Sequence, residues 1–473
     1  MKFTVISHAC LYIEHKETKL LIDPWLIGSC YWRSWWNYPE PKIDLVKSLK
    51  PTHIYITHLH WDHYHGPSLR LFEYLQPKVI FPRHFAKRLV GDCKKDFKFK
   101  NIYEIDHGNT FTIGEDFDIT SYQFNPGFID SSLVIETDGI TILDANDTKT
   151  FGLSLNQILS NHKNIDFVLR SHSSASPLPH CINGSNPEDS SRSKMAYANE
   201  FSFFCAKTKA KFAIPFASSH FYLHENTKKY NKNYSNPNFV KSIHEKIVNQ
   251  DEQKCILMPS GSSFSKKNGF KFIDHNYNDI QKHVNEGILK NSKKLNQQLL
   301  LSKKIKLNKT KFHQYFKKFF SATVFPFSLN FNYAYIVFES KSNVIYLCAV
   351  YGKEKTTKIY ELKDRKEIRN YNMTFTIELP IYVFNDLNAK NMHNTFSPSK
   401  HLEINLIKKN SIKKLNKLLT IIDLYENDCL PLYKLINLRC ILIFIRRWRE
   451  IVDIFIYVIK IKFLKQKIKE LYI

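Results

Sequence analysis

Short runs of β-branched and aromatic residues dominate the first 150 positions of the chain. Turn residues separate these runs, which is typical of the strands of a compact sheet. Apolar residues at helical spacing predict helices at Ser68–Leu75, Ser154–Asn161 and Lys194–Thr208, and a Ser/Pro/Gly/Asn stretch predicts a long loop over 173–193. The predicted strands are KFTVIS, CLYIEH, KLLIDPW, THIYITH, KVIFP, FDITSY, SSLVIE, GITILD, DFVLRSH and KFAIPF.

The pattern changes after residue 264, so we expect three regions: 1–264, 265–320 and 321–473. Residues 281–320 hold eleven Lys and one Glu. This composition favours a solvated helical connector over contact with anionic lipid or nucleic acid. The third region predicts a smaller α+β unit with strands in AYIVFES, NVIYLCAV and MTFTIELPIYVF and a long, apolar, core-packing helix from about Leu432 to Leu471.

Composition excludes a mostly disordered chain, because 43% of the 473 residues are hydrophobic and 14% aromatic. The net charge of +25 fits the drift of an AT-rich genome together with solvated Lys. We therefore expect no nucleic-acid partner and leave peripheral membrane contact of the basic C-terminal part open. Nine scattered cysteines without a CxxC pair predict reduced thiols and a cytoplasmic protein without a signal peptide.

The stretch Thr57–Gly66, THLHWDHYHG, directly follows the predicted strand HIYITH. It places His58, His60, Asp62 and His63 at a strand end and in the loop beyond it. Imidazole nitrogens and a carboxylate are ligands that suit Zn²⁺. The spacing therefore predicts a site for one or two zinc ions, with iron or manganese left open.

The spacing HxHxDH resembles the signature of the metallo-β-lactamase fold superfamily. The resemblance implies an α/β fold, a four-layer αββα metallo-β-lactamase sandwich, here followed by the smaller α+β C-terminal unit. It implies that Asp147, after the strand GITILD, bridges the metals, with Asp144 as the alternative. The segment LLIDPW is similar to the L-ascorbate-6-phosphate lactonase-like branch, where Asp23 would orient ligands instead of binding metal.

Residues 1–265 also resemble the metallo-β-lactamase-like part of the CMP-N-acetylneuraminate hydroxylase family. The matching segments are DPWLIGSCYWRSWWNYPEP, IYITHLHWDHYHGPSL, IDSSLVIETDGITILDANDT and IPFASSHFYLHENTKKYNK. That family also carries a Rieske iron–sulfur domain, whose CxH and CxxH ligand patterns do not occur in this sequence. Hydroxylase chemistry would therefore need a separate Rieske or electron-transfer partner.

The sequence departs from the superfamily at its third histidine ligand. That histidine stands just before the strand SSLVIE in most members, whereas this stretch holds Asn125, a poor substitute. His172, at the end of DFVLRSH, is a candidate replacement. For the last metal ligand the resemblance offers His220 or His224.

The substrate-binding candidates are His8, Arg33, Trp35 and Trp36. His8 would line the pocket, and Arg33 would contact an anion. The aromatic patch around Trp35 and Trp36 has two interpretations, stacking on a sugar or base and packing at the edge of the sandwich. His53 and His65 are expected to be structural.

These residues predict a metal-dependent hydrolase in which a metal-bound hydroxide attacks a phosphoester, lactone or amide of a small molecule. Asp62 would take or give a proton. The resemblance suggests a sugar or nucleotide-sugar substrate. Two alternatives stay open, namely a di-iron oxygenase component with a separate Rieske partner and a metal-binding protein without catalysis.

Overall fold

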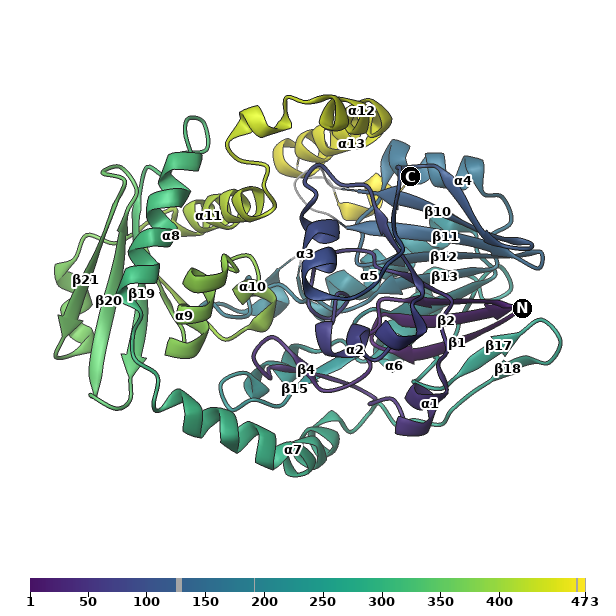
Figure 1. Ribbon diagram of the computed structural model, residues 1–473, viewed down its shortest axis with the longest axis horizontal. Coiled ribbons are helices and arrows are strands. Elements are labelled where there is room, and N and C mark those ends of the chain that lie inside the picture. The colour runs from purple at the N-terminus through teal and green to yellow at the C-terminus, as the bar shows by residue number, and fades with distance from the viewer. Residues whose placement is uncertain (125–129, 191, 465–466, 473) are drawn as a thin grey trace.

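Two large β-sheets pack face to face in the computed structural model, which describes residues 1–124, 130–190, 192–464 and 467–472 (Figure 1). From edge to edge, the first sheet consists of β18 (Gly269–Lys271), β17 (Ser263–Ser265), β1 (Lys2–Ser7), β2 (Cys10–His15), β3 (Thr18–Ile22), β6 (His53–Tyr55), β7 (Lys78–Pro82) and β8 (Ile102–Ile105). The second consists of β16 (Lys254–Cys255), β14 (Phe212–Phe216), β13 (Phe167–Ser171), β12 (Ile140–Asn146), β11 (Ser131–Thr137), β10 (Phe117–Gln123) and β9 (Thr110–Gly114).

The alternation of side chains along the strands builds the layers. Leu11 and Ile13 of β2 and Leu133 and Ile135 of β11 point into the core between the sheets, whereas Val134 points to the outer face. Successive side chains of a strand face opposite sides, so a strand that is apolar throughout needs cover on both faces.

Helices supply that cover and complete the four layers. The first sheet is covered by α1 (Ile43–Ser48), α2 (Gly66–Arg70), the 3₁₀ turn η1 (Glu73–Leu75) and α3 (Arg88–Asp96). The second is covered by α4 (Gly152–Asn161), α5 (Lys194–Thr208) and α6 (Pro237–Ile247). The predicted αββα sandwich is therefore confirmed.

Parallel strands bring several loops to one edge of the sandwich. In the first sheet β3, β6, β7 and β8 run parallel, and in the second β12, β13, β14 and β16 do. Residues that follow the carboxyl ends of parallel strands meet at one edge. A third, small sheet of β4 (Ser29–Cys30), β5 (Trp35–Asn37) and β15 (His220–Tyr222), together with the 3₁₀ turns η2 (Pro187–Asp189) and η3 (Lys228–Asn233), completes this part.

The Lys-rich region packs on both parts of the molecule. Helix α7 (Ile280–Ser302) approaches β15 at Gly287, where a Cβ would lie 2.9 Å from Phe221 and 3.0 Å from Leu223. Helix α8 (Lys309–Ala322) buries Phe312 and Phe316 in the C-terminal unit. The apolar face of each helix is therefore part of a core, while most of the Lys side chains stay exposed.

The C-terminal unit has a five-stranded sheet of β21 (Thr356–Leu362), β20 (Val344–Tyr351), β19 (Asn332–Glu339), β22 (Phe375–Glu378) and β23 (Glu403–Leu406). Its other elements are the 3₁₀ turn η4 (Arg365–Asn370), α9 (Ile381–Lys390), α10 (Phe396–Ser399) and α11 (Ser411–Glu426). One continuous core joins Tyr335 and Leu418 of this unit to Trp35 and Tyr222 of the first part.

The strand predicted over MTFTIELPIYVF is wrong in its second half. Strand β22 ends at Glu378, and α9 begins after its N-cap Pro380. Proline has no N–H for a sheet ladder, and its φ is compatible with the start of a helix.

The single apolar helix predicted from Leu432 to Leu471 is also wrong. The segment consists of η5 (Leu432–Leu435), α12 (Leu438–Arg446), α13 (Trp448–Tyr457), a π-helical turn η6 (Val458–Phe463) and the 3₁₀ turn η7 (Ile468–Leu471). The break lies at Arg447, whose φ of −100° and ψ of 18° leave the helical region. Arg447 is buried there with Glu450, and its Nε and Nη2 donate to the carboxylate oxygens Oε2 and Oε1 of Glu450 at 2.7 and 3.0 Å. The side chains of Arg447 and Glu450 therefore face the protein interior, and their ion pair holds the chain in place where α12 ends and α13 begins.

Asp453 attaches α13 to the sandwich. Its two carboxylate oxygens accept hydrogen bonds from the backbone N–H groups of Leu153 and Ser154, each at 2.7 Å. These are free donors in the first turn of α4, and a carboxylate there also meets the positive end of the helix dipole. Asp453 thus caps a helix that lies 300 residues earlier in the sequence.

We expect Asp453→Ala to lower the free energy of unfolding by about 1–2 kcal/mol, because the cap of α4 is lost. Urea unfolding followed by circular dichroism measures the change. Asp251→Ala, at an exposed aspartate, is the matched control and should change stability by less than about 0.5 kcal/mol. Equal effects of the two substitutions would contradict the capping role.

Candidate metal centre

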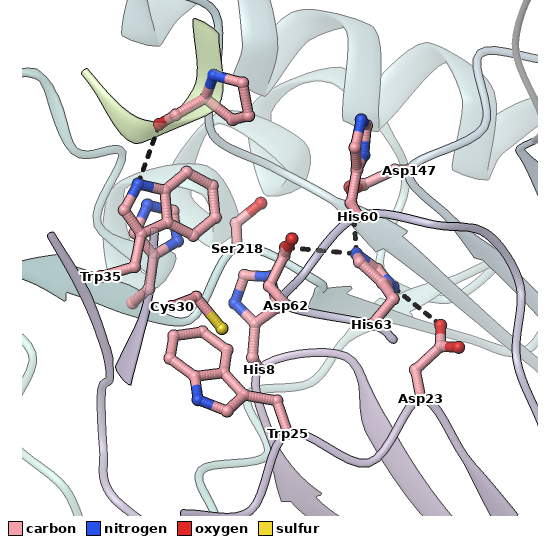
Figure 2. A network of polar contacts seen from close by, with 12 residues as sticks. His8, Asp23, Trp25, Cys30, Trp35, His60, Asp62, His63, Asp147 and Ser218 are labelled. Carbon is pink, nitrogen blue, oxygen red and sulfur yellow. Dashed lines mark hydrogen bonds and ion pairs between the residues drawn. The ribbon is translucent and has the colours of Figure 1, made fainter. Parts of the chain in front are cut away.

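The histidine motif begins two residues after β6 and ends where α2 starts. Asp23 follows β3, Asp147 follows β12 and His8 follows β1, so four strand ends bring their residues to one edge of the sandwich. Figure 2 shows His8, Asp62, His63, His60 and Asp147 gathered at this edge, with Asp23 behind His63.

The carboxylate of Asp23 is fully buried and fixes His63. It accepts hydrogen bonds from Thr57 N (2.8 Å), Thr57 Oγ1 (2.6 Å) and Asn146 Nδ2 (2.9 Å). His63 Nδ1 lies 2.7 Å from the same carboxylate (Figure 2). A proton on Nδ1 completes this set, and it turns the Nε2 lone pair of His63 toward the other ligands. This is the geometry of a residue that orients a metal ligand.

Three overlapping groups of donors surround His58 and His63. Within each group the donor atoms lie within 4.8 Å of one another. Such proximity is the requirement for shared coordination of a cation, and two neighbouring ions could share donors from this set. The groups are His58, His60 and Asp130; His58, His63 and Asp147; and His8, Asp62 and His63.

Individual contacts show how tightly the donors lie. His58 Nε2 is 2.7 Å from His60 Nδ1, and His63 Nε2 is 3.2 Å from Asp147 Oδ2 and 3.3 Å from Asp62 Oδ2. Nitrogen lone pairs and carboxylates that converge in this way need a proton or a cation between them. The donor set therefore fits a divalent metal.

The protonation states of His58, Asp62 and Asp147 suit metal binding, whereas burial acts to lower the pKa of His63 but Asp62 and Asp23 outweigh it and raise that pKa, so a bound metal would have to displace a proton from His63. Burial, together with the nearby His63, lowers the pKa of His58 to about 4, so its imidazole is neutral at pH 7. Burial acts to raise the pKa of Asp62, but His63 outweighs it and holds that pKa well below the usual value. The same balance lowers the pKa of Asp147 to about 2. Neutral imidazole and ionised carboxylate are the forms that bind metals.

Asp130 is a candidate ligand that sequence reasoning missed. It lies immediately before β11, next to the place where most superfamily members hold the third histidine, and its Oδ1 is 3.9 Å from His58 Nε2. The signal in the sequence is a carboxylate directly before the predicted strand SSLVIE, where the resemblance led us to expect a histidine. Asn125 lies outside the described residues.

Of the three late histidines, His172 and His220 lie near these groups, whereas His224 lies against the C-terminal unit. His172 Nδ1 faces the carbonyl oxygen of Phe216 at 3.3 Å, and His224 Nε2 contacts Tyr382 Oη at 3.2 Å in the C-terminal unit. The ring of His220 stacks on Trp35 with centroids 3.6 Å apart. Within the described ranges, none of these three histidines joins a three-donor group. Their metal-binding roles stay predictions, as does the less favoured one of Asp144, whose buried carboxylate lies under the site.

The aromatic patch is largely packing. Trp35 is buried between His220 and the C-terminal unit, where its Nε1 donates to the carbonyl oxygen of Pro398 at 2.9 Å. Trp36 is buried as well, and its Nε1 donates to the carbonyl oxygen of Arg33 at 3.0 Å. The structure thus places the two tryptophans as the packing interpretation describes. The Arg33 guanidinium lies at the edge of the patch, partly buried.

Tyr31, from the same patch, reaches the metal centre. Tyr31, Trp32 and Arg33 have φ values of 52°, 54° and 62°, a left-handed turn that is rare for non-glycine residues. The turn places the Tyr31 hydroxyl 2.5 Å from Asp62 Oδ1, while His8 Nε2 lies 2.9 Å from Oδ2. Burial and Asp62 raise the pKa of Tyr31, so the hydroxyl donates to the carboxylate.

A cavity of about 310 Å³ opens on these donors. His60, Asp130 and Asp147 line it together with Lys149 and Arg192. Asn394, Ser397 and Asp423 of the C-terminal unit form part of its wall. The candidate site is therefore built by both parts of the molecule.

Comparison with known proteins agrees with this description. Residues 2–126 match the family model of the beta-lactamase superfamily domain. The cytidine monophosphate-N-acetylneuraminic acid hydroxylase of Asterias rubens is 31% identical over 159 residues, 31% of this chain and 23% of that protein. The Mus musculus enzyme is 35% identical over 80 residues, 17% of this chain and 14% of that protein. The chain thus spans about a quarter or less of the length of these relatives.

Solved structures with similarity to the chain include a metallo hydrolase from Ignicoccus hospitalis, at 16% identity and a TM-score of 0.39, covering 56% of this chain and 98% of that one. A diiron β-hydroxylase from Streptomyces venezuelae has 17% identity and a TM-score of 0.40, covering 56% of this chain and 53% of that one.

Residues 2–126, which match the family model, contain β1 to β10 and the whole histidine motif. This part of the chain is a domain of the metallo-β-lactamase superfamily.

Proposed function

We propose that the chain is a metal-dependent hydrolase of a small substrate that carries an anionic group. The observation that carries the proposal is the set of overlapping donor groups, members of which line a cavity together with Lys149 and Arg192. His58, His60 and Asp130 would hold one metal, and His63, Asp62 and Asp147 a second. A bound zinc ion would act as a Lewis acid and bring the pKa of a coordinated water near 7.

Asp62 is the residue of this chain to which we assign proton transfer. The contacts with Tyr31 and His8 hold its carboxylate in one orientation, and the neighbouring His63 keeps it ionised. An ionised carboxylate beside the reacting centre can accept a proton from an attacking water and return it to the leaving group.

The cations that line the cavity would bind the anionic part of the substrate. Arg192 Nη1 donates to Tyr197 Oη at 2.8 Å, and Lys149 Nζ lies 4.4 Å above the Tyr197 ring. Burial acts to raise the pKa of Tyr197, yet Arg192 and Lys149 outweigh it and lower that pKa, while the Glu200 carboxylate, 3.7 Å from Lys149 Nζ, opposes their effect. The proposed substrate is a phosphoester, lactone or amide of a sugar or nucleotide sugar that carries an anionic group. Its negative charge would complement these cations, and the names of the relatives favour a substrate of this kind.

An oxygenase component is a second candidate. His58, His60 and Asp130 form a two-histidine, one-carboxylate set, the donor set of many non-haem iron oxygenases. The curated relatives are named hydroxylases. A separate Rieske or other electron-transfer partner would then supply electrons, because the sequence has no Rieske ligand pattern.

Metal analysis of the full chain is the first test. We expect one to two zinc ions per chain by inductively coupled plasma mass spectrometry, and the loss of about one of them in His58→Ala/His60→Ala, which removes two of the three donors of one proposed metal. His313→Ala, at an exposed histidine of α8, is the matched control and should keep the metal.

The hydrolase is then tested on phosphodiester, lactone, amide and nucleotide-sugar substrates. Zinc with hydrolysis of one class supports the proposal. Iron together with donor-dependent oxygen consumption would favour the oxygenase. A folded wild-type chain that binds neither metal would overturn both.

Asp130 should behave as the replacement for the third histidine. Asp130→Ala is expected to weaken metal binding by about ten-fold or more, because one group loses one of its three donors. Asp130→His restores a donor of the type that most superfamily members use, and it should recover most of the affinity. Competition with a chromogenic chelator measures both. Unchanged affinity of the Ala variant would exclude Asp130 from the site.

Lys149→Gln tests the anionic part of the substrate. For an anionic substrate we expect about a ten-fold rise in KM, because a cation that faces the cavity is lost. A neutral analogue of the same scaffold is the control, and its KM should change by less than about two-fold. An equal effect on both analogues would argue against charge recognition.

A further inference from the structure

The helices α12 and α13 carry their apolar side chains on the outside. In α12, Leu438, Ile441, Leu442 and Ile445 have exposed fractions of 48–71%, at spacings of three and four residues. Such spacing places them on one helix face. The face continues along α13 and into η6 with Trp448, Ile451, Val452, Phe455 and Ile459. We name this set of nine side chains the apolar stripe; both helices lie at the periphery of the molecule (Figure 1).

The protein itself holds the apolar stripe outward. On the inner side, Cys440 and Ile443 pack against Phe85, and Glu450 pairs with Arg447 in a buried ion pair. Asp453 caps α4, as described above. A rotation that buried the stripe would expose this ion pair and break the cap. The outward orientation is therefore built into the fold.

Positive charge accompanies the stripe, while acidic groups point away from it. Residues 432–473 contain ten Lys or Arg and three Asp or Glu, a net charge of +7. Two of the acidic residues, Glu450 and Asp453, are buried on the inner side. Arg446 and Arg439 pair with Asp106 and Glu104 of the sandwich and Arg447 pairs with Glu450, whereas Arg449 lies 4.8 Å from the Trp448 ring, beside the stripe. The outer surface thus combines apolar side chains with cations.

We propose that the apolar stripe docks the protein on an anionic lipid surface. A helix pair with an apolar face and a basic rim lies in the plane of the headgroups, with the apolar face toward the acyl chains and the cations on the phosphates. Trp448, which has a polar edge on an apolar ring, suits that depth. This proposal does not depend on the proposed hydrolase activity, and it would place the candidate site at a membrane surface.

Helix length decides that the stripe lies on a bilayer and does not cross it. Helices α12 and α13 have nine and ten residues, about 14–15 Å each, against about 30 Å of hydrocarbon. Throughout the described part of the chain, no helix is both long and apolar enough for a span.

Charge argues against a second copy of the chain as the occupant. A symmetric contact would bring the Arg449 side chains of two copies to the same apolar surface, without the inward-facing Glu450 and Asp453 to balance them. Like charges at a desolvated contact are unfavourable. Anionic headgroups supply the missing counter-charge.

The test is co-sedimentation of the full chain with vesicles of phosphatidylcholine alone or with about a third phosphatidylserine. We expect binding to the anionic vesicles only, with weaker binding as salt rises, because screening reduces the attraction. Ile451→Ser/Phe455→Ser should lower the partition coefficient about ten-fold or more, since two apolar side chains leave the interface. Arg449→Gln should lower it less.

A matched control variant separates binding through the apolar stripe from nonspecific hydrophobic adsorption to the vesicles. Leu301→Ser/Phe325→Ser removes two side chains that are 55% and 88% exposed elsewhere, and binding should stay unchanged. Circular dichroism and unchanged metal content show that each variant is folded. Lack of binding by the wild type, or equal binding by both double variants, would overturn the proposal. A dimer in light scattering that dissociates in Ile451→Ser/Phe455→Ser, without vesicle binding, would assign the stripe to a second copy.

Discussion

One buried carboxylate holds the candidate site together. Asp23 leaves the first sheet at the end of β3 and accepts hydrogen bonds from Thr57, also of that sheet, and from Asn146 of the second. A buried charge without partners would be costly, so the donors from both sheets have to meet around it. His63 contacts the same carboxylate. The relative position of the two sheets and the orientation of His63 thus depend on one group.

Much of the sandwich could be predicted because its information is local. Alternation and β-branched runs predicted strands such as Lys2–Ser7 and Cys10–His15, and the order HxHxDH after a strand predicted where His58 and His63 would converge. Asp130 escaped the prediction because the resemblance led us to expect a histidine at this strand start, and its proximity to His58 depends on how the two sheets pack.

The final segment could not be predicted for a related reason. Apolar periodicity identifies a helix face but does not say which way that face points. The apolar pattern predicted a core-packing helix, whereas the structure exposes many of the apolar side chains of α12 and α13 and buries Arg447, Glu450 and Asp453. Their partners lie up to 300 positions away in sequence, and burial of a charged group is favourable only where those partners are in place.

The core that joins the sandwich to the C-terminal unit has a thermodynamic consequence. Trp35 and Tyr222 of the first part belong to the same continuous core as Tyr335 and Leu418 of the second. Neither part can lose its structure without exposing aromatic surface of the other. The two parts therefore form one cooperative unit, and the geometry of the donor cluster is coupled to the folding of a sheet that contributes no donor to it.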